Sequence, residues 1–307
     1  MNGEFLRDAL AGLTAEPKTL PGKYLWDETG SDLFDQICHS ADYYPTTQEM
    51  ALLPQAAADV ARAVAPGATV VEFGSGASRK IRTLLDALPS PAAYVAIDIS
   101  GEYLEAAIRR LAADYPAISM VPVCADYSKP VQLPVAAGAG GILGFYPGTS
   151  IGNFDPREAG LFLERARATL GPSLFLVGAD GTTDPDRLRR AYGEAGGLMA
   201  AFHRNILTRL NAELGADFDR DNFQHTVRLL PEPFRVEAHL VAIRPATYRL
   251  GDQTIAFAAA ESIRTDTSHK YTADAFRAVA AASGWRPRAL WQGEGGSFNL
   301  HLLEAEA

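Results

Sequence analysis

Three short polar segments of the sequence could together bind a nucleoside cofactor. Gly74-Ser75-Gly76 follows an apolar run, and glycines at that point let the backbone turn tightly and approach a ligand. Asp98 ends the next apolar run, where a carboxylate can accept hydrogen bonds from both hydroxyls of a ribose. Asp126 and Tyr127 end the third run with an acid beside an aromatic ring. Polar residues of these types at the ends of three successive apolar runs indicate a nucleoside site more strongly than any one of the three segments alone.

The glycine segment helps to distinguish between two candidate cofactors, S-adenosylmethionine and NAD. A dinucleotide fingerprint needs a third glycine, and the chain has Arg79 where it would stand. In class I methyltransferases, an acid at the position of Asp126 binds the adenine amine, and an adjacent aromatic ring covers the adenine. The sequence therefore favours S-adenosylmethionine over NAD. The residues alone still allow an Asx turn at Asp126, an NAD-dependent oxidoreductase, or a non-catalytic binding protein.

The segment after the fourth apolar run could receive a substrate amine. Residues 145–154 occupy the usual place of the acceptor in that class of enzyme, and they include Asn153. An asparagine amide offers donors and an acceptor, so it could orient an amine without protonating it. A helix-entry residue ahead of Asp155 is the alternative interpretation of Asn153.

Apolar runs that alternate with helical segments must position these residues. A parallel sheet covered by helices on both faces produces this alternation and brings its strand ends to one edge. Asp155-Pro156 begins one helix in the favoured way, with Glu158 completing the cap. Thr46 and Glu49 resemble a capping box ahead of a helix over 50–64. The expected strands are 69–73, 94–98, 118–125, 141–145 and 173–177, with helices over 79–88, 101–113 and 156–171.

The alternation breaks after residue 182. Residues 186–214 look helical and long, whereas 234–250 and 254–258 are typical of an antiparallel meander. The alternation returns with a helix from Thr272 and strands over 289–292 and 298–303. We therefore expect an α/β chain that carries an insertion, and a terminal strand pair that adds an antiparallel strand to the sheet.

Composition disfavours several classes of partner. The formal net charge is -9 and the basic residues are not clustered, which argues against nucleic acid and against an anionic membrane surface. No apolar run approaches the ~20 residues that span a membrane, and no signal core follows Met1. Cys38 and Cys124 fit a reducing compartment, and the 6 histidines lack metal-ligand spacing. We expect a cytoplasmic monomer without a metal that acts on a small molecule.

Longer motifs connect the chain to one enzyme family. They are 27–35 (Asp-Glu-Thr-Gly-Ser-Asp-Leu-Phe-Asp), 43–46 (Tyr-Tyr-Pro-Thr), 74–80, 150–153, 201–205 (Ala-Phe-His-Arg-Asn) and 264–268 (Arg-Thr-Asp-Thr-Ser). With these motifs the chain resembles, over nearly its whole length, the histidine-specific Nα-methyltransferases of ergothioneine biosynthesis. The resemblance implies S-adenosylmethionine as methyl donor. It also implies successive methyl transfers to the amine of free L-histidine, giving the trimethylated betaine hercynine.

The resemblance implies a Rossmann-like class I methyltransferase sheet with a second α+β substrate-binding domain. Residues 49–182 and 272–307 would form the cofactor domain, and 1–48 and 183–271 the substrate domain. By position, the cofactor would be held by Gly74, Ser75, Gly76, Lys80, Asp98, Asp126 and Tyr127. The α-amino and α-carboxylate groups would be held by Tyr43, Asn153 and Tyr192, of which Tyr43 and Asn153 would be catalytic. The substrate side chain would be read by Asp266, Thr267 and Ser268, with Trp26 and Ala238 at the same pocket.

Some positions depart from the family pattern. The family has tyrosine in place of Trp26, glutamate in place of Asp266, arginine in place of Thr47 and a larger apolar residue in place of Ala238. A pocket with Ala238 could admit a bulkier ring than imidazole. Nα-methylation of tryptophan, or of another aromatic or indole amino acid, is therefore the alternative within this reaction class.

Overall fold

The computed structural model describes residues 2–76, 79–135, 137–194 and 197–306, so Ala77 and Ser78 of the glycine motif lie outside the described residues. The chain forms two compact units. Unit 1 comprises Met1–Tyr44 and Asp184–Ser268, and unit 2 comprises Pro45–Thr183 and His269–Ala307. These limits fall within a few residues of the predicted domain limits. Which unit binds which ligand stays a prediction.

Unit 2 is built on a 7-stranded sheet in the order β12-β13-β6-β5-β2-β3-β4. β13 is antiparallel to both of its neighbours, whereas the strands from β6 to β4 are parallel to one another. This order and the antiparallel β13 confirm the expected Rossmann-like class I methyltransferase sheet. The strands are β2 (Thr69–Phe73), β3 (Ala93–Asp98), β4 (Ser119–Cys124), β5 (Ile142–Tyr146), β6 (Ser173–Asp180), β12 (Arg286–Gln292) and β13 (Phe298–Ala305).

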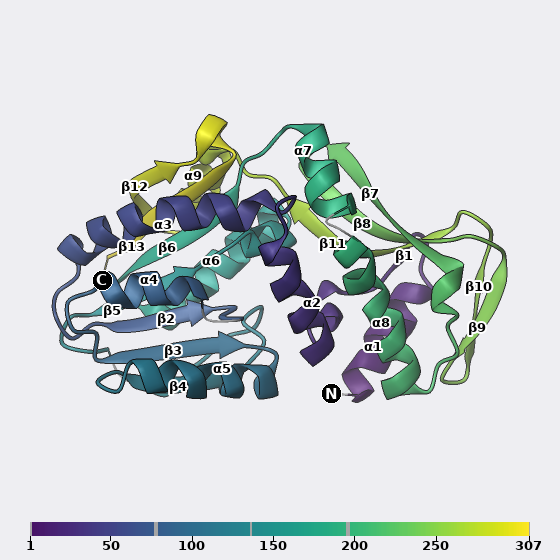
Figure 1. Ribbon diagram of the computed structural model, residues 1–307, viewed down its shortest axis with the longest axis horizontal. Coiled ribbons are helices and arrows are strands. Elements are labelled where there is room, and N and C mark those ends of the chain that lie inside the picture. The colour runs from purple at the N-terminus through teal and green to yellow at the C-terminus, as the bar shows by residue number, and fades with distance from the viewer. Residues whose placement is uncertain (1, 77–78, 136, 195–196, 307) are drawn as a thin grey trace. The chain divides into compact units, whose positions relative to one another are not determined.

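Alternating side chains of β2 divide the core of unit 2 between the two faces of the sheet. Val70 joins a cluster with apolar residues of α3, α4 and α5, and Val71 joins a second cluster with residues of α6 and α9 (Figure 1). Burying a side chain of this size contributes about 1.5–3 kcal/mol. The helices are α3 (Tyr44–Ala63), α4 (Arg79–Ala87), α5 (Gly101–Asp114), α6 (Pro156–Leu170) and α9 (Ala273–Ala282).

Of the two predicted helix caps, one is confirmed and one is wrong. At α6, Asp155 accepts from the Glu158 backbone and Glu158 reaches back to Asp155, which completes the capping box. The capping box at Thr46 and Glu49 does not form, because α3 begins at Tyr44 and both residues lie inside it. Glu49 is instead completely buried.

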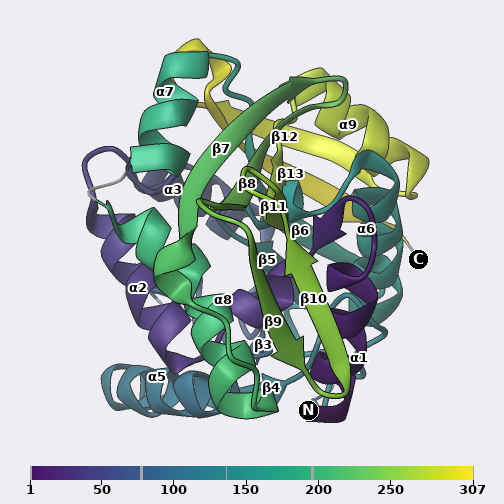
Figure 2. The same ribbon diagram turned by 90° about the vertical axis from the view of Figure 1, so that its right-hand side faces the viewer.

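Unit 1 combines a 4-stranded sheet, in the order β1-β11-β8-β7, with a separate 2-stranded ribbon of β10 and β9. Figure 2 shows the two antiparallel strands of the ribbon side by side. The strands are β1 (Lys18–Thr19), β7 (Phe223–Pro231), β8 (Phe234–Ala242), β9 (Ala246–Leu250), β10 (Gln253–Phe257) and β11 (Ser262–His269). The helices include α1 (Asn2–Leu13), α2 (Glu28–His39), α7 (Pro185–Arg189) and α8 (Leu198–Leu214).

The long helix predicted over 186–214 is interrupted. α7 passes into a π-helical turn, Arg190–Glu194, and α8 begins only at Leu198. Gly197 caps α8 with a φ of 81°, in the left-handed region that a side chain disfavours. Within the described residues, no helix combines the length and apolar character that a membrane crossing requires.

Candidate active site

The glycine loop and Asp98 meet at the carboxyl ends of β2 and β3. Gly74 and Gly76 have φ values of 70° and 49°, so this turn uses the left-handed backbone that glycine allows. The Gly76 N–H donates to Asp98 Oδ2 over 3.1 Å, and the Ser100 N–H donates to Asp98 Oδ1 over 3.0 Å. The parallel pairing of β2 with β3 thus joins two of the predicted cofactor residues.

Tyr127 lies against the same loop. A Cβ added to Gly74 would come 3.4 Å from the Tyr127 hydroxyl. The ring also makes edge contacts with Phe73 and Tyr146. Burial, followed by the nearby Asp98 charge, raises the pKa of Tyr127 to about 12, so its hydroxyl is neutral at physiological pH. Tyr127 therefore offers a neutral ring beside the glycine loop.

Asp126 forms the Asx turn that was the alternative interpretation of this position. The Ser128 backbone N–H and hydroxyl donate to Asp126 Oδ1 over 3.0 and 2.6 Å. Burial raises the pKa of Asp126, but the hydrogen bonds from Ser128 and the charge of Lys129 lower it further than burial raises it. Asp126 is thus ionised, while adenine binding by this carboxylate stays a prediction.

These residues fit an adenosine cofactor. A Cβ at Gly76 would meet nothing within 4 Å among the residues that the structure describes. The Ser75 hydroxyl is buried and has no hydrogen-bond partner within the described parts of the chain. A buried hydroxyl on the loop that contacts the strand-end acid Asp98 matches the polar edge of a nucleoside. No group of three or more potential metal ligands occurs among the described residues.

Lys80 is held by a residue that the sequence did not single out. Its ammonium lies 2.6 Å from Glu49 Oε2, and Glu49 Oε1 accepts from the Gly148 N–H over 2.8 Å. Glu49 therefore ties α3 to the start of α4 and to the turn after β5. In the sequence, Glu49 was only an acid next to an Ala-rich helix, and it resembled part of a capping box.

Glu72 is a second buried acid that sequence patterns did not identify. Tyr94 donates a hydrogen bond to its carboxylate from the neighbouring strand. Burial raises the pKa of Glu72 to about 8, although Tyr94 and Lys80 act in the opposite direction. Glu72 is therefore largely protonated near neutral pH. It contributes little negative charge to the region around Lys80 and Glu49.

Asn153 lies on a short 3-10 turn, Ser150–Asn153, after β5. Its side chain is exposed and makes no hydrogen bond to any residue that the structure describes, whereas Ile151 and Gly152 are buried. The Gly152 carbonyl accepts from the His269 ring over 3.2 Å, and the Phe154 carbonyl accepts from the Tyr271 hydroxyl over 2.8 Å. The backbone on each side of Asn153 is thus fixed while its amide remains available.

The predicted aromatic substrate residues of unit 1 form one cluster. Tyr43 packs edge-on against Phe34 and Tyr192, with ring centroids 5.8 Å apart in both pairs. Trp26 packs edge-on against Phe34 at 4.9 Å and against Phe202 at 5.3 Å. Such contacts are worth about 0.5–1.5 kcal/mol beyond area burial. The structure therefore brings Trp26, Tyr43 and Tyr192 into one group.

β11 carries the predicted side-chain-reading segment. The Ser268 hydroxyl lies 3.4 Å from the Tyr192 hydroxyl, which connects this segment to the aromatic cluster. Asp266 lies against the backbone at Gly22, where an added Cβ would come 2.9 Å from Asp266 Oδ1. Thr267 is half-buried. Ala238 is 7% exposed on β8, and its carbonyl accepts from the Thr265 hydroxyl over 3.4 Å.

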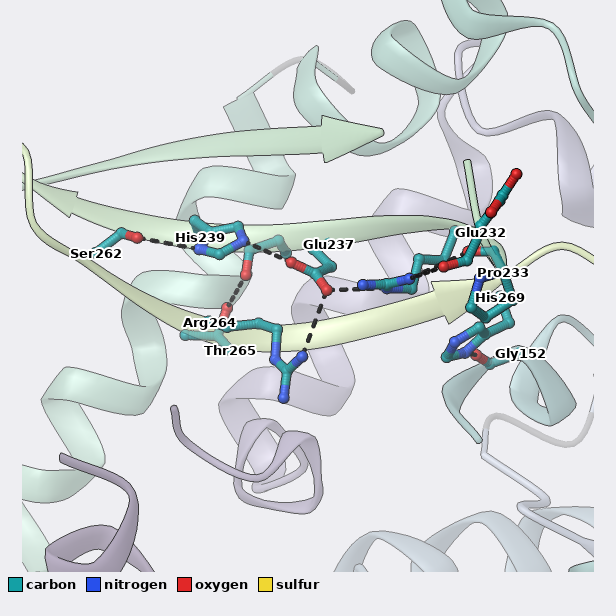
Figure 3. A network of polar contacts seen from close by, with 11 residues as sticks. Gly152, Glu232, Pro233, Glu237, His239, Ser262, Arg264, Thr265 and His269 are labelled. Atoms are coloured by element: carbon teal, nitrogen blue, oxygen red, sulfur yellow. Dashed lines mark hydrogen bonds and ion pairs between the residues drawn. The ribbon is translucent and has the colours of Figure 1, made fainter. Parts of the chain in front are cut away.

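Sequence patterns also did not predict a polar network on β8, which Figure 3 shows. Glu237 accepts hydrogen bonds from Arg235 over 2.9 Å and from His239 Nε2 over 3.1 Å, and Arg264 adds a contact of 3.4 Å. Burial raises the pKa of Glu237, but Arg235, His239 and Arg264 lower it further. Alternation along β8 places Glu237 and His239 on the face opposite Ala238.

Two buried histidines of unit 1 give a testable pH dependence. The rings of His203 and His225 are stacked 4.8 Å apart at 6°. Burial lowers the pKa of His203 well below 6.5 and that of His225 to about 4. Both are neutral when folded but ionise near pH 6.5 when unfolded, so their stabilisation is present above pH 6.5 and is lost as pH falls toward 4. From His225 alone, the free energy of unfolding should drop by roughly 2–3 kcal/mol between pH 7 and pH 4.

Denaturant unfolding at several pH values measures this dependence. His225→Phe, which keeps a ring for stacking but cannot ionise, should flatten the profile, whereas His39→Phe on the exposed end of α2 should not. An identical acid profile for His225→Phe and the unchanged chain would contradict the assignment.

Several known proteins are similar to this chain. The family model described as histidine-specific, S-adenosylmethionine-dependent methyltransferase matches residues 5–305. The chain is 38% identical to a histidine N-alpha-methyltransferase of Mycolicibacterium smegmatis over 96% of this chain and 93% of that protein. It is 31% identical to ergothioneine biosynthesis protein 1 of Neurospora crassa, over 65% of this chain and 23% of that protein. The solved CcbJ methyltransferase from Streptomyces caelestis aligns with a TM-score of 0.47 at 14% identity, over 82% of this chain and 95% of that one.

Proposed function

Since this chain belongs to the histidine-specific, S-adenosylmethionine-dependent methyltransferases, we propose that it methylates the α-amino group of free L-histidine to the trimethylated betaine. The observation that carries the proposal is the family match, which extends over both units. The 38% identity to a histidine N-alpha-methyltransferase supports the same substrate. The product would enter ergothioneine biosynthesis, as the similarity to a protein of that name supports.

Residues of unit 2 would hold the cofactor, which supplies an electrophilic methyl group on a sulfonium. Asp98 would accept hydrogen bonds from the ribose hydroxyls, in keeping with its position beside the glycine loop. Tyr127 would cover the adenine and Asp126 would bind its amine. Ser75 would use its unpartnered hydroxyl, and Lys80, held by Glu49, would complete the set.

Asn153 would orient the substrate amine. Its amide oxygen can accept from the amine without protonating it, and only a neutral amine has the lone pair that the displacement requires. Each of the first two methylated products must lose a proton before it reacts again. Tyr43 or a water molecule would receive these protons, and positioning the two reactants would supply most of the rate enhancement.

Residues of unit 1 would read the amino acid. Tyr43 and Tyr192 would bind its α-amino and α-carboxylate groups, while Asp266, Thr267 and Ser268 would recognise the imidazole. Trp26 and Ala238 would border the ring. A carboxylate and a hydroxyl suit the two ring nitrogens of imidazole, which can donate and accept, better than the single N–H donor of indole. This polarity supports histidine over tryptophan.

Histidine analogues methylated on the ring test the proposal directly. Histidine should react with a kcat/KM at least tenfold above that of either ring-methylated isomer, because a blocked ring nitrogen leaves Asp266 or Ser268 without its partner. Asp266→Asn should reduce the preference, whereas Asp252→Asn, on the exposed turn of the β9–β10 ribbon, should not. Equal turnover of all three amino acids would contradict side-chain reading by these residues.

The protein would act as a monomer in the cytoplasm on this small molecule. The net charge of -9 supports a partner other than nucleic acid or an anionic membrane surface. The free thiol of Cys124 agrees with a reducing compartment.

A further inference from the structure

Three consecutive residues, His269-Lys270-Tyr271, follow the segment proposed to read the substrate side chain. The chain enters unit 2 at His269, and each of the three side chains then contacts unit 2. Their partners are the Asn153 turn and the end of β6. One short segment thus contacts the turn that carries Asn153, the residue proposed to orient the amine.

Lys270 anchors the segment. Its ammonium lies 2.7 Å from Asp180 Oδ2, and the side chains are 0% and 1% exposed. Asp180 also accepts from the Thr182 N–H over 2.9 Å, and its carbonyl accepts from the Tyr271 N–H over 2.7 Å. A buried pair of this kind resists separation, because each charge would be left unpaired in a medium of low polarity. The backbone of the segment is therefore fixed to the carboxyl end of β6.

His269 and Tyr271 extend from this anchor to the carbonyls of Gly152 and Phe154, the residues before and after Asn153. Figure 3 shows His269 beside Gly152, whose carbonyl accepts from His269 Nδ1 over 3.2 Å. The Tyr271 hydroxyl donates to the Phe154 carbonyl over 2.8 Å. The Asn153–Phe154 peptide between these two carbonyls is held by the Phe154 N–H, which donates to the Ile151 carbonyl over 3.3 Å. The backbone on both sides of Asn153 is therefore restrained, and with it the direction of its Cα–Cβ bond.

The Asn153 amide itself is exposed and has no hydrogen bond within the described chain. Its backbone therefore sets the point from which the side chain extends and the direction of its Cα–Cβ bond. Phe154 stacks on Phe162, with centroids 5.4 Å apart, which fixes the following side chain as well. The contacts of His269 and Tyr271 are the restraints that their segment adds to the backbone around Asn153.

We propose that His269 and Tyr271 are positioning residues that aim the Asn153 amide at the substrate amine, with the Lys270–Asp180 pair as their anchor. The proposal rests on the proposed role of Asn153. It gives the segment from Asp266 to Tyr271 two consecutive tasks, reading the side chain and then orienting the group that binds the amine.

Tyr271→Phe removes one hydroxyl and keeps the ring, which packs against Phe276. We expect kcat for histidine to fall about tenfold, because a small misplacement of a reacting group has large kinetic effects. The Kd for S-adenosylmethionine, measured by calorimetry, should change less than twofold. Tyr115→Phe is the matched control, since it removes a hydroxyl that bonds Asp86 on the exposed side of unit 2. It should leave kcat unchanged.

At His269, the hydrogen-bond donor should matter more than the ring. His269→Gln keeps an N–H donor for the Gly152 carbonyl and should retain more than half of kcat, whereas His269→Leu should lose about tenfold. Equal kcat in these two variants would overturn the role of His269. Thermal unfolding of both variants separates this effect from loss of fold.

A double-mutant cycle distinguishes positioning from general support. If Tyr271 acts through Asn153, adding Tyr271→Phe to Asn153→Ala should change kcat no further. Multiplied effects of the two changes would overturn the proposal, as would unchanged kcat in Tyr271→Phe. Unchanged kcat in Asn153→Ala alone would instead remove the proposed role of Asn153, so the two failures are distinguishable.

Discussion

Asn153→Ala is expected to lower kcat about 100-fold, because it removes the group proposed to orient the amine for displacement. The Kd for S-adenosylmethionine should stay within about twofold, because the proposed cofactor residues lie on the glycine loop, at the start of α4 and at the ends of β3 and β4. Single-turnover kinetics and calorimetry measure the two quantities separately.

Asn153→Asp sharpens this test, since it keeps the shape and the accepting oxygen but replaces the amide donors with a charge. Arg157→Ala, an exposed change on the neighbouring helix α6, is the control for general effects and should leave kcat unchanged. Wild-type turnover in Asn153→Ala would exclude this residue from the mechanism.

Asp98→Ala is expected to raise the Kd for S-adenosylmethionine by roughly 100-fold. Two hydrogen bonds from ribose hydroxyls to a charged acceptor, at about 1.5 kcal/mol each, account for a change of this size. Asp98 also accepts from Gly76 and Ser100, so its loss loosens the glycine loop in the same direction.

Asp98→Asn should have an intermediate effect, because it keeps one accepting oxygen and the loop contact through it. Asp114→Asn, at an exposed acid of α5, is the matched control and should leave the Kd unchanged. Normal cofactor affinity in Asp98→Ala would contradict the proposed ribose site.

Much of unit 2 could be predicted because its central strands β2, β3, β5 and β6 are short, apolar and buried on both faces. Such runs end where the sheet ends, so Asp98 and Asp126 could be assigned to one edge from sequence alone. The strands of unit 1 gave a weaker signal. β7 and β11 mix His, Arg and Thr with apolar residues, and neither was predicted as a strand. Their side chains enter polar contacts that periodicity does not report.

Contacts between distant residues account for what the sequence could not reveal at the site. Glu49 looked like a helix cap because its partners Lys80 and Gly148 lie 31 or more positions away in the sequence, and they meet only in the folded unit. Likewise, the hydrogen bond from Tyr271 to Phe154 spans 117 positions. The Asn153 motif was recognisable, but the groups that fix its backbone were not.

The most direct test of the central claim is a mass-spectrometric turnover assay. Purified protein and S-adenosylmethionine would be incubated with each of the twenty amino acids separately, and products scored for the addition of one, two and three methyl groups. Histidine should be converted to its trimethylated form far faster than any other amino acid. Faster methylation of tryptophan or another amino acid, or no methylation of histidine, would contradict the proposed function.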